Sequence, residues 1–218
     1  MEYTEFWTLL SINNIILDIY QIELFKRYEK ELLYWNEKIN LISRKDYENI
    51  LEKHFLHCLA ILKYVEFPEK AKCLDVGTGG GLPGLPLKIA LPDIYLTLSD
   101  SIKKKIKITE IFAKHTELRN IECKLGRVED LQDNDKYKNY FDTIVSRAVA
   151  TTVQLIDWTF PLLKKDGNYA FLKGGDLREE IKVAQKKYPQ LSFKIIDIDM
   201  IGYAAFKKDE KKIVLITT

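Results

Sequence analysis

Short apolar runs alternate with helix-like stretches over most of this chain, and this alternation restricts its fold more than any other feature. Strands that alternate with helices form a mostly parallel sheet with helices on both faces. Gly202 and the charged segment 207–212 separate the last two runs, which predicts a closing antiparallel hairpin. We therefore expect an α/β protein with a mostly parallel, seven-stranded sheet. The expected strands lie at 71–76, 94–100, 121–126, 141–146, 168–173, 191–199 and 212–218, and the expected helices at 84–91, 102–116, 151–164 and 176–187.

The segment before this alternation has a helical pattern instead. Apolar residues three or four positions apart predict an amphipathic helix over 21–38. A second helix is expected from Asp46, a good N-cap, to Leu62. The chain thus divides into a helical extension, residues 1–62, and an α/β domain, residues 63–218.

Composition narrows the class of protein further. The 218 residues are 46% hydrophobic and 30% charged, which is ordinary for a globular protein and excludes disorder. No apolar run reaches the roughly 18 residues that span a bilayer, and residues 1–14 lack the features of a signal peptide. We therefore expect a cytoplasmic protein. The three cysteines fit neither a disulfide framework nor a zinc site, and no metal is expected.

The most informative segment is LDVGTGGGLPG, residues 74–84, between an expected strand and an expected helix. Gly77, Gly79 and Gly81 allow a tight turn and a close approach of a ligand to the helix N-terminus. Gly79, Gly81 and Gly84 also have the G-x-G-x-x-G spacing of nicotinamide dinucleotide sites. An acidic residue at the strand end, Asp75, suits the positive end of S-adenosylmethionine better. A third interpretation is a turn that only connects the two elements.

Asp100 ends the second expected strand, where an acidic side chain accepts hydrogen bonds from both ribose hydroxyls of a nucleoside. It could instead cap the helix that follows. Both candidate cofactors contain ribose, so Asp100 does not separate them.

Five segments resemble the bacterial 16S ribosomal RNA guanine-N7 methyltransferases, the glucose-inhibited division protein B family, in order and spacing. They are LDVGTGGGLPGLPL (74–87), TLSDSIKKK (97–105), GRVEDL (126–131), FDTIVSRAVA (141–150) and FLKG (171–174). The segments LLYWNEKINLIS (32–43) and KHFLHCLAIL (53–62) are similar to the N-terminal signature of that family. The chain departs from the family pattern at His57-Cys58, where many members have Asp-Ser.

The resemblance implies a Rossmann-like class I methyltransferase fold, S-adenosylmethionine as cofactor, and methylation of a guanine N7 in the decoding-centre loop of 16S ribosomal RNA. It places Gly77 and Leu82 on the cofactor loop. It also places Val128 and Glu129 beside the adenine, although those residues could simply begin a helix. The partner it implies is 16S ribosomal RNA, the small ribosomal subunit or an assembly intermediate, and we expect a monomer.

Arg147 matches a conserved arginine of that family and ends the fourth expected strand. It is expected to hold phosphate, guanine O6 or the cofactor carboxylate, unless it pairs with Asp142 or Asp75. Since guanine N7 has a lone pair and no proton to lose, no general base is expected, and catalysis depends on positioning. The methionine end of the cofactor and the guanine base of the substrate would then meet near Arg147.

A basic rim beside the cofactor site is expected to bind RNA phosphates. Its candidates are Lys104 and Lys105, together with Arg127 and Lys173 on later loops. The lysines could also belong to a solvated helix face. Two other functions remain open: a nicotinamide-dependent oxidoreductase, and a non-catalytic RNA-binding factor on a methyltransferase fold.

Overall fold

Seven strands form a single sheet in the computed structural model, in the order β3-β2-β1-β4-β5-β7-β6. All neighbouring strands are parallel except β5 with β7 and β6 with β7, which are antiparallel. The predicted fold and its closing hairpin are confirmed. The structure describes residues 1–43 and 46–218 in full, and of residues 44 and 45 only the backbone. The strands are β1 (Lys72–Val76), β2 (Tyr95–Asp100), β3 (Ile121–Leu125), β4 (Phe141–Arg147), β5 (Leu163–Gly174), β6 (Ser192–Asp197) and β7 (Lys211–Thr217).

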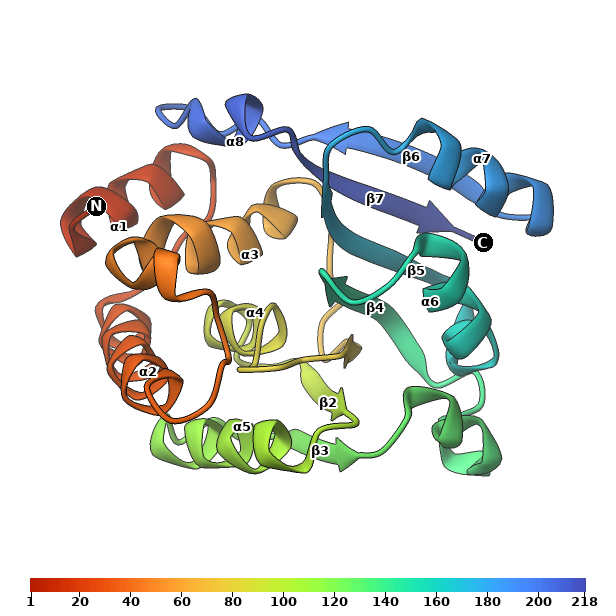
Figure 1. The fold of residues 1–218 in the computed structure, drawn as a ribbon, viewed down its shortest axis with the longest axis horizontal. Helices are drawn as coiled ribbons and strands as arrows, with labels where there is room; N and C mark the ends of the chain where they lie inside the picture. The colour runs from red at the N-terminus through yellow and green to blue at the C-terminus, as the bar shows by residue number, and fades with distance from the viewer.

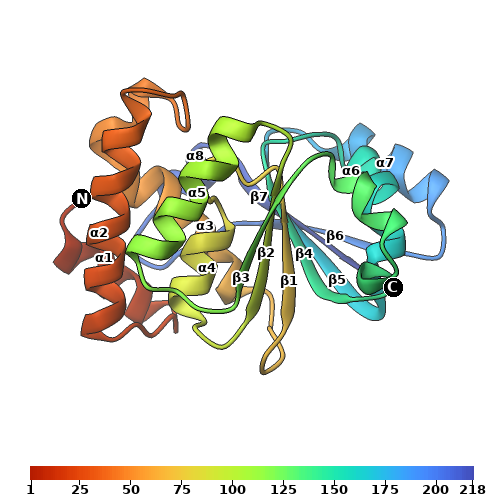
Figure 2. The same ribbon diagram turned by 90° about the horizontal axis from the view of Figure 1, so that it is seen from below.

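Helices cover both faces of the sheet (Figures 1 and 2). On one face lie α3 (His57–Leu59), α4 (Gly84–Ala90) and α5 (Lys103–His115), and on the other α6 (Thr152–Thr159) and α7 (Arg178–Lys187). Each face has its own cluster of buried apolar side chains. Alternate residues of β1 divide between these clusters, with Cys73 in one and Leu74 and Val76 in the other.

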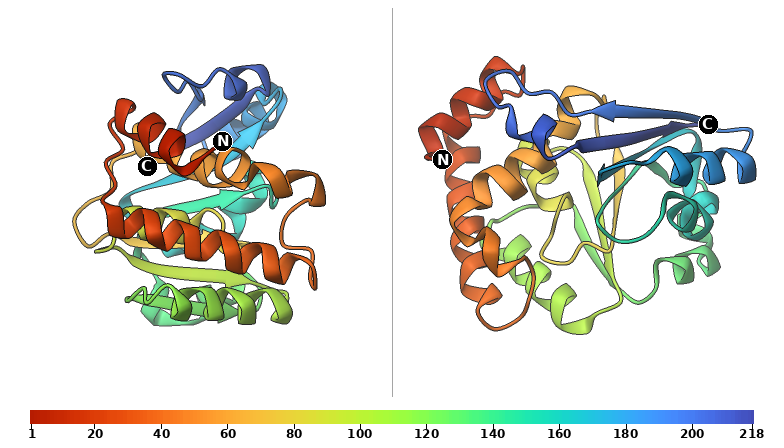
Figure 3. Two further views of the ribbon diagram at one scale, coloured as in Figure 1. Left: turned by 90° about the vertical axis from the view of Figure 1, so that its left-hand side faces the viewer. Right: turned by 45° about the horizontal axis from the view of Figure 1, so that its top comes forward.

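Two N-terminal helices form an outer layer: α2 (Ile19–Asn36) lies over α4 and α5, and α1 (Tyr3–Ile12) lies against the helical segment that leads into α3 (Figures 2 and 3). Asp18 caps α2 by accepting from Gln21 N at 2.7 Å, and the Gln21 side chain accepts from Asp18 N in return. The helix predicted over 21–38 is thus confirmed, with both ends two residues earlier. Buried residues on both sides of residue 62 belong to one cluster. The division into two domains at that residue stays a prediction.

The second predicted helix, from Asp46 to Leu62, is helical but irregular. The segment passes through a 3₁₀ turn (Arg44–Asn49), a π-helical stretch (Leu51–Leu56), α3 and a second 3₁₀ turn (Ala60–Lys63). A π turn takes more residues than an α turn, so it changes which side chains share a face. The expectation of one regular helix was therefore wrong.

Two further differences lie in the second half of the chain. The helix expected over 151–164 ends at Thr159, because Pro161 follows in a 3₁₀ turn and β5 already begins at Leu163. A short helix, α8 (Ala205–Lys208), has no counterpart among the predicted elements. The loop before α8 is fastened to the end of α1, where the Asn13 side chain bonds both the amide and the carbonyl of Ile201.

Candidate functional site

A cavity of about 420 Å³ opens at the carboxyl edge of the sheet. Its walls come from the loops that follow β1, β2, β3 and β4. The strand order runs outward from β1 to β3 on one side and from β4 to β5 on the other. Ligands of open α/β sheets bind at such a switch point, beyond the carboxyl ends of the strands.

The wall next to β1 is bare backbone that only glycine permits. Gly77 has φ +66°, and a Cβ there would lie 2.5 Å from Cγ2 of Val149 on the loop after β4. Gly79 also has a positive φ, +57°, but its missing Cβ would meet open space apart from a backbone oxygen 4.0 Å away. The two glycines therefore bring main-chain amides to the cavity surface without side chains in the way. Both line the cavity, as does Leu82.

Asp75 does not line the cavity, and this corrects its expected contact with the cofactor. Its side chain is fully buried behind the loop, where Oδ2 accepts from Thr78 Oγ1 at 2.6 Å and from Gly84 N at 2.9 Å. Asp75 therefore joins the turn to the start of α4. Burial raises the pKa of this carboxyl to about 7. Its charge consequently no longer distinguishes S-adenosylmethionine from a nicotinamide dinucleotide.

Gly81 lies behind the loop in the same way. A Cβ on Gly81 would stand 2.4 Å from Cδ1 of Leu85, and the residue is absent from the cavity wall. The expectation that it touches the cofactor is corrected for the same reason as that of Asp75. Its role is to let the loop return tightly against α4.

Asp100 faces the glycine turn across the cavity. Its Oδ2 accepts from Gly79 N at 2.9 Å, and its Oδ1 accepts from Ile102 N at 2.8 Å, just before α5. The N-cap of α5 is Ile102, without a side-chain cap bond, so Asp100 braces the turn before the helix but does not cap it, and its contact with a ribose stays a prediction. Each carboxylate oxygen accepts more than one hydrogen bond, so the side chain retains capacity for hydroxyl donors.

Val128 and Glu129 form the wall beyond β3, next to Gly126 and Arg127. They begin a 3₁₀ helix (Val128–Asp133), so the alternative that this segment starts a helix also holds. Trp158 of α6 completes this side of the cavity with a partly buried indole. Its apolar helical spacing is typical of core residues and gives no signal of a cavity wall.

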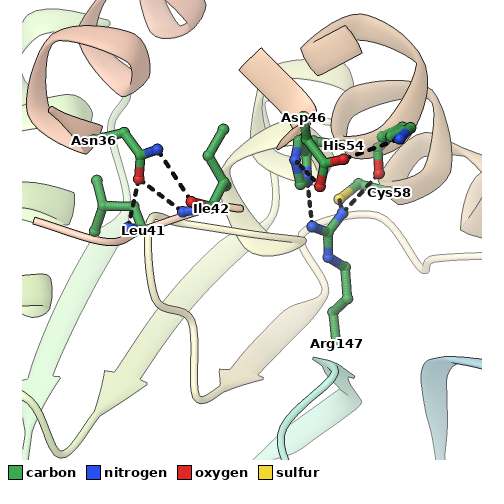
Figure 4. Close-up of polar contacts among 8 residues, drawn as sticks. Asn36, Leu41, Ile42, Asp46, His54, Cys58 and Arg147 are labelled. Atoms are coloured by element: carbon green, nitrogen blue, oxygen red, sulfur yellow. Dashed lines mark hydrogen bonds and ion pairs between the residues drawn. The ribbon is translucent and has the colours of Figure 1, made fainter. Parts of the chain in front are cut away.

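The N-terminal extension supplies another part of the wall. Leu41 lines the cavity, and the buried Asn36 side chain holds its loop by accepting from Leu41 N and Ile42 N at 2.6 and 2.9 Å (Figure 4). Tyr28, fully buried in α2, donates to Gly80 O at 2.6 Å. No local sequence signal pointed to these contacts, since they join segments far apart in the chain.

Arg147 ends β4 and reaches the irregular helical segment rather than either expected acid. Nη1 donates to the carbonyl of Lys53 at 3.2 Å and Nη2 contacts Nδ1 of His54, while Cys58 Sγ lies 3.8 Å away (Figure 4). Asp142 is occupied elsewhere, by Lys164 Nζ at 2.6 Å. The alternative that Arg147 forms a salt bridge with Asp142 or Asp75 is therefore wrong.

His54 holds Arg147 as a neutral side chain. Burial, and then the charge of Arg147, lower the pKa of His54 to about 3. Its Nδ1 is therefore free to face the guanidinium as an acceptor. The other ring nitrogen, Nε2, lies 3.5 Å from Asp46 Oδ2. The imidazole of His54 and the carbonyl of Lys53 thus hold the guanidinium at the edge of the cavity, while His54 Nε2 itself has no hydrogen-bond partner among the described residues.

The four expected RNA-binding residues occupy different environments. Lys105 and Arg127 line the cavity, whereas Lys104 is exposed on α5 outside it. Lys173 is half-buried, and its Nζ donates to Glu180 at 2.7 Å and to the carbonyl of Ala150 at 2.6 Å. Lys173 lines a different cavity, so the four residues do not form one continuous group.

Two kinds of feature are absent from the described part of the chain. No group of three histidine, cysteine or acidic residues is arranged there to hold a metal ion. No helix there is long and apolar enough to cross a membrane.

Solved structures share the fold of this chain at low sequence identity. YcgJ from Bacillus subtilis aligns with a TM-score of 0.55 and 16% identity, covering 75% of this chain and 97% of its own. M. jannaschii TYW2, solved in complex with AdoMet, aligns with a TM-score of 0.56 and 15% identity, covering 83% of this chain and 78% of its own. These similarities concern the fold alone.

Sequence relatives are much closer. The ribosomal RNA small subunit methyltransferase G of Thermoanaerobacter sp. is 38% identical over 86% of this chain and 78% of its own length. The protein of the same name from Desulfitobacterium hafniense is 37% identical over 93% of this chain and 83% of its own. The model of the GidB family, described as rRNA small subunit methyltransferase G, matches residues 21–206. The chain therefore belongs to the GidB family of small-subunit ribosomal RNA methyltransferases.

Proposed function

We propose that this chain transfers a methyl group from S-adenosylmethionine to N7 of a guanine in the decoding-centre loop of 16S ribosomal RNA. The observation that carries the proposal is the glycine-walled cavity at the sheet's switch point, opposite Asp100, in a chain of this family. Its substrate is 16S ribosomal RNA, as part of the small subunit or of an assembly intermediate. We propose that it acts as a monomer in the cytoplasm.

The cavity suits S-adenosylmethionine in size and in chemistry. Its volume of about 420 Å³ lies within the range of roughly 300–1,000 Å³ that is usual for small-ligand sites. Asp100 offers acceptors for ribose hydroxyls, and Val128, Glu129 and Trp158 provide a partly apolar wall for the adenine. The backbone at Gly77 and Gly79 leaves room for the methionine end. When bound, the cofactor supplies an electrophilic methyl group on a sulfonium.

The residues around this cavity fit a reaction that depends on positioning. Guanine N7 carries a lone pair, so no side chain has to remove a proton before the methyl group moves. The two histidines nearest the site, His54 and His57, are buried outside this cavity, and burial lowers the pKa of both. Arg147, fixed by His54, stands where the guanine and the methionine end have to be held together. Its charge can orient either one without taking part in proton transfer.

The most direct test of the acceptor atom uses a modified substrate. Small-subunit ribosomal RNA with 7-deazaguanosine at the target position, which lacks N7, should receive no methyl group. The same RNA with an ordinary guanosine, assembled from the same fragments, is the matched control. Methylation of the 7-deaza RNA would overturn the N7 assignment and move it to N1, the exocyclic amine or the ribose.

The pH dependence tests the absence of a general base. The single-turnover rate at saturating RNA and cofactor should be nearly flat from about pH 6.5 to 8.5, whereas a histidine base would impose its titration there. Asp75 has a pKa of about 7, so Asp75→Asn is measured beside the parent. An inflection in the rate–pH profile that disappears in Asp75→Asn comes from titration of Asp75 in the loop after β1. One that persists in this variant contradicts the proposed mechanism.

Two other functions make different predictions for cofactor binding. A nicotinamide-dependent oxidoreductase would bind NAD, and a non-catalytic RNA-binding factor would bind neither cofactor. Calorimetry with S-adenosylmethionine and with NAD therefore separates the three. We expect binding of S-adenosylmethionine alone, weakened by Asp100→Ala by roughly 1–3 kcal/mol because the acceptors for two hydroxyls are removed. Asp100→Asn, which keeps one acceptor oxygen, should have a smaller effect.

A further inference from the structure

A second cavity of about 420 Å³ adjoins the first. The two share Arg147 and Ala148, so the end of β4 forms the wall between them. The second cavity is otherwise built by the irregular helical segment, the end of β5 and the start of β7. It lies at the same carboxyl edge of the sheet as the cofactor cavity, where an acceptor strand has to come to meet the methyl group.

Most of the charge around this second cavity is positive. Four basic side chains line it, against two acidic ones, Asp46 and Asp209. Asp46 is committed to Lys53, with 3.0 Å between Oδ1 and Nζ. The four basic residues are Lys53, Arg147, Lys173 and Lys211.

Lys211 and Arg147 are the two basic residues of this cavity that have no acidic partner among the described residues. Lys53 pairs with Asp46, and Lys173 pairs with Glu180 at 2.7 Å. Lys211 Nζ makes no hydrogen bond or ion pair with the described residues. Lys211 begins β7 opposite Gly174, the last residue of β5, which places it at the carboxyl edge of the sheet.

A buried polar atom without a partner provides independent support. His57 lines the second cavity, is 6% exposed, and its Nε2 has no hydrogen-bond partner among the described residues. An unsatisfied buried polar atom costs free energy, so a ligand that bonds it is favoured. Burial and the nearby charges of Arg147 and Lys211 hold the pKa of His57 well below its usual range. The imidazole is therefore neutral and adds no charge of its own to the cavity.

We propose that the second cavity binds a phosphate group of the RNA strand beside the nucleotide that is methylated, with Lys211 as its principal cation. The assignment rests on the proposed function for the identity of the RNA. A phosphate takes its charge complement from Lys211 and Arg147 and its hydrogen bonds from their N–H groups. Anchoring the strand on one side of Arg147 leaves the neighbouring base to enter the cofactor cavity on the other side. The shared wall thus determines which nucleotide reaches the methyl group.

The test compares two lysines that differ in their position on the sheet. Lys211→Ala removes the charge in the cavity, and Lys211→Arg keeps it. Lys194→Ala removes an exposed charge from β6 and serves as the control. Lys194 lies opposite Leu215 in the sheet, four residues along β7 from Lys211. Binding of unmethylated small-subunit ribosomal RNA is measured by filter retention over a series of salt concentrations. Binding of S-adenosylmethionine is measured by calorimetry.

We expect Lys211→Ala to lower RNA affinity roughly three- to tenfold at low salt and to reduce the slope of log K against log salt by about one unit. Lys211→Arg and Lys194→Ala should keep the parent slope, and no variant should change the affinity for S-adenosylmethionine. A parent-like slope in Lys211→Ala, or an equal reduction in Lys194→Ala, would overturn the proposal.

Methyl transfer by the parent protein is measured on the same RNA, which separates this proposal from the proposed function. Transfer by the parent together with a parent-like slope in Lys211→Ala rejects the phosphate site alone. The expected slopes without any methyl transfer reject the proposed function and retain the phosphate site. Absence of RNA binding by the parent overturns both.

Discussion

The two cavities that meet at Arg147 have similar volumes but are built in different ways. The first cavity has one wall of main chain, at Gly77 and Gly79, held in place by buried contacts such as those of Asp75 and Tyr28. The second cavity is bounded by long basic side chains and two histidines. A backbone wall has a fixed shape, whereas lysine side chains adapt to a ligand. The two proposed sites thus place rigid recognition of a small molecule beside adaptable recognition of a nucleic acid strand.

The largest effect should come from adding one methyl group to the backbone wall. In Gly77→Ala the new Cβ would stand 2.5 Å from Val149, and φ is +66°, so the loop has to move. Strain and overlap together cost roughly 2–5 kcal/mol. We expect the affinity for S-adenosylmethionine, measured by calorimetry, to fall at least about tenfold, since the wall itself shifts.

Gly175→Ala is the matched control for this variant. Gly175 has φ +73°, but a Cβ there would meet no atom within 4 Å. It should therefore lose about 1 kcal/mol of stability from backbone strain and keep the parent's cofactor affinity. Gly77→Ala combined with Val149→Ala should regain part of the missing affinity. Equal affinities in Gly77→Ala and Gly175→Ala would mean that the wall is not rigid.

A second prediction concerns the carboxyl that holds the wall from behind. The pKa of Asp75 is raised to about 7, so between about pH 4 and 7 the folded chain keeps a proton that the unfolded chain releases. The free energy of unfolding should therefore fall with rising pH in this window, by up to roughly 4 kcal/mol. Asp75→Asn keeps one oxygen for Thr78 and Gly84 without this titration.

The measurement is denaturant unfolding of parent and Asp75→Asn at several pH values. Contributions of the other titrating groups cancel in the difference between the two proteins. That difference should shift in favour of the variant as the pH rises from 4 to 7. A constant difference over this range would show that Asp75 titrates as in an exposed site, and that the backbone wall does not depend on it.

The smallest effect is expected at the exposed rim of the cofactor cavity. Lys104→Ala with Lys105→Ala should reduce RNA affinity a few-fold, lower the salt slope by about one unit for each phosphate that is no longer bound, and leave cofactor affinity nearly unchanged. The double variant Lys182→Ala with Lys186→Ala removes two exposed charges from α7, on the other face of the sheet. If both double variants have the same slope in filter binding, the rim does not contact RNA.

Most of the fold was predictable because its signals are local. Strands buried on both faces have continuous apolar runs, and the helices between them have the period of an amphipathic helix. The irregular segment 44–63 was not predictable in detail, because its apolar spacing is compatible with a regular α-helix. The end of the helix at Thr159 did have a local signal, Pro161, two residues later.

The cofactor site was predictable where its residues follow a strand directly. Gly77, Gly79 and Asp100 were found in this way, Val128 and Glu129 through the family resemblance, and all five line the cavity. The face of the sheet on which the Asp75 side chain lies was also predictable from the sequence. Side chains alternate along a strand, so Asp75 lies on the opposite face from Leu74 and Val76, toward α4. Leu41 and Trp158 had none, because only tertiary contacts bring them to the cavity. The roles of all these residues in binding stay predictions.

The contacts of Tyr28 and Asn36 make the outer helical layer part of the ligand site. Tyr28 holds the carbonyl of Gly80, and Asn36 holds the loop that carries Leu41. A ligand that binds only the folded cavity stabilises every element that the cavity requires. Occupancy of the cofactor cavity is therefore linked to local unfolding of α2, some distance away in the sequence.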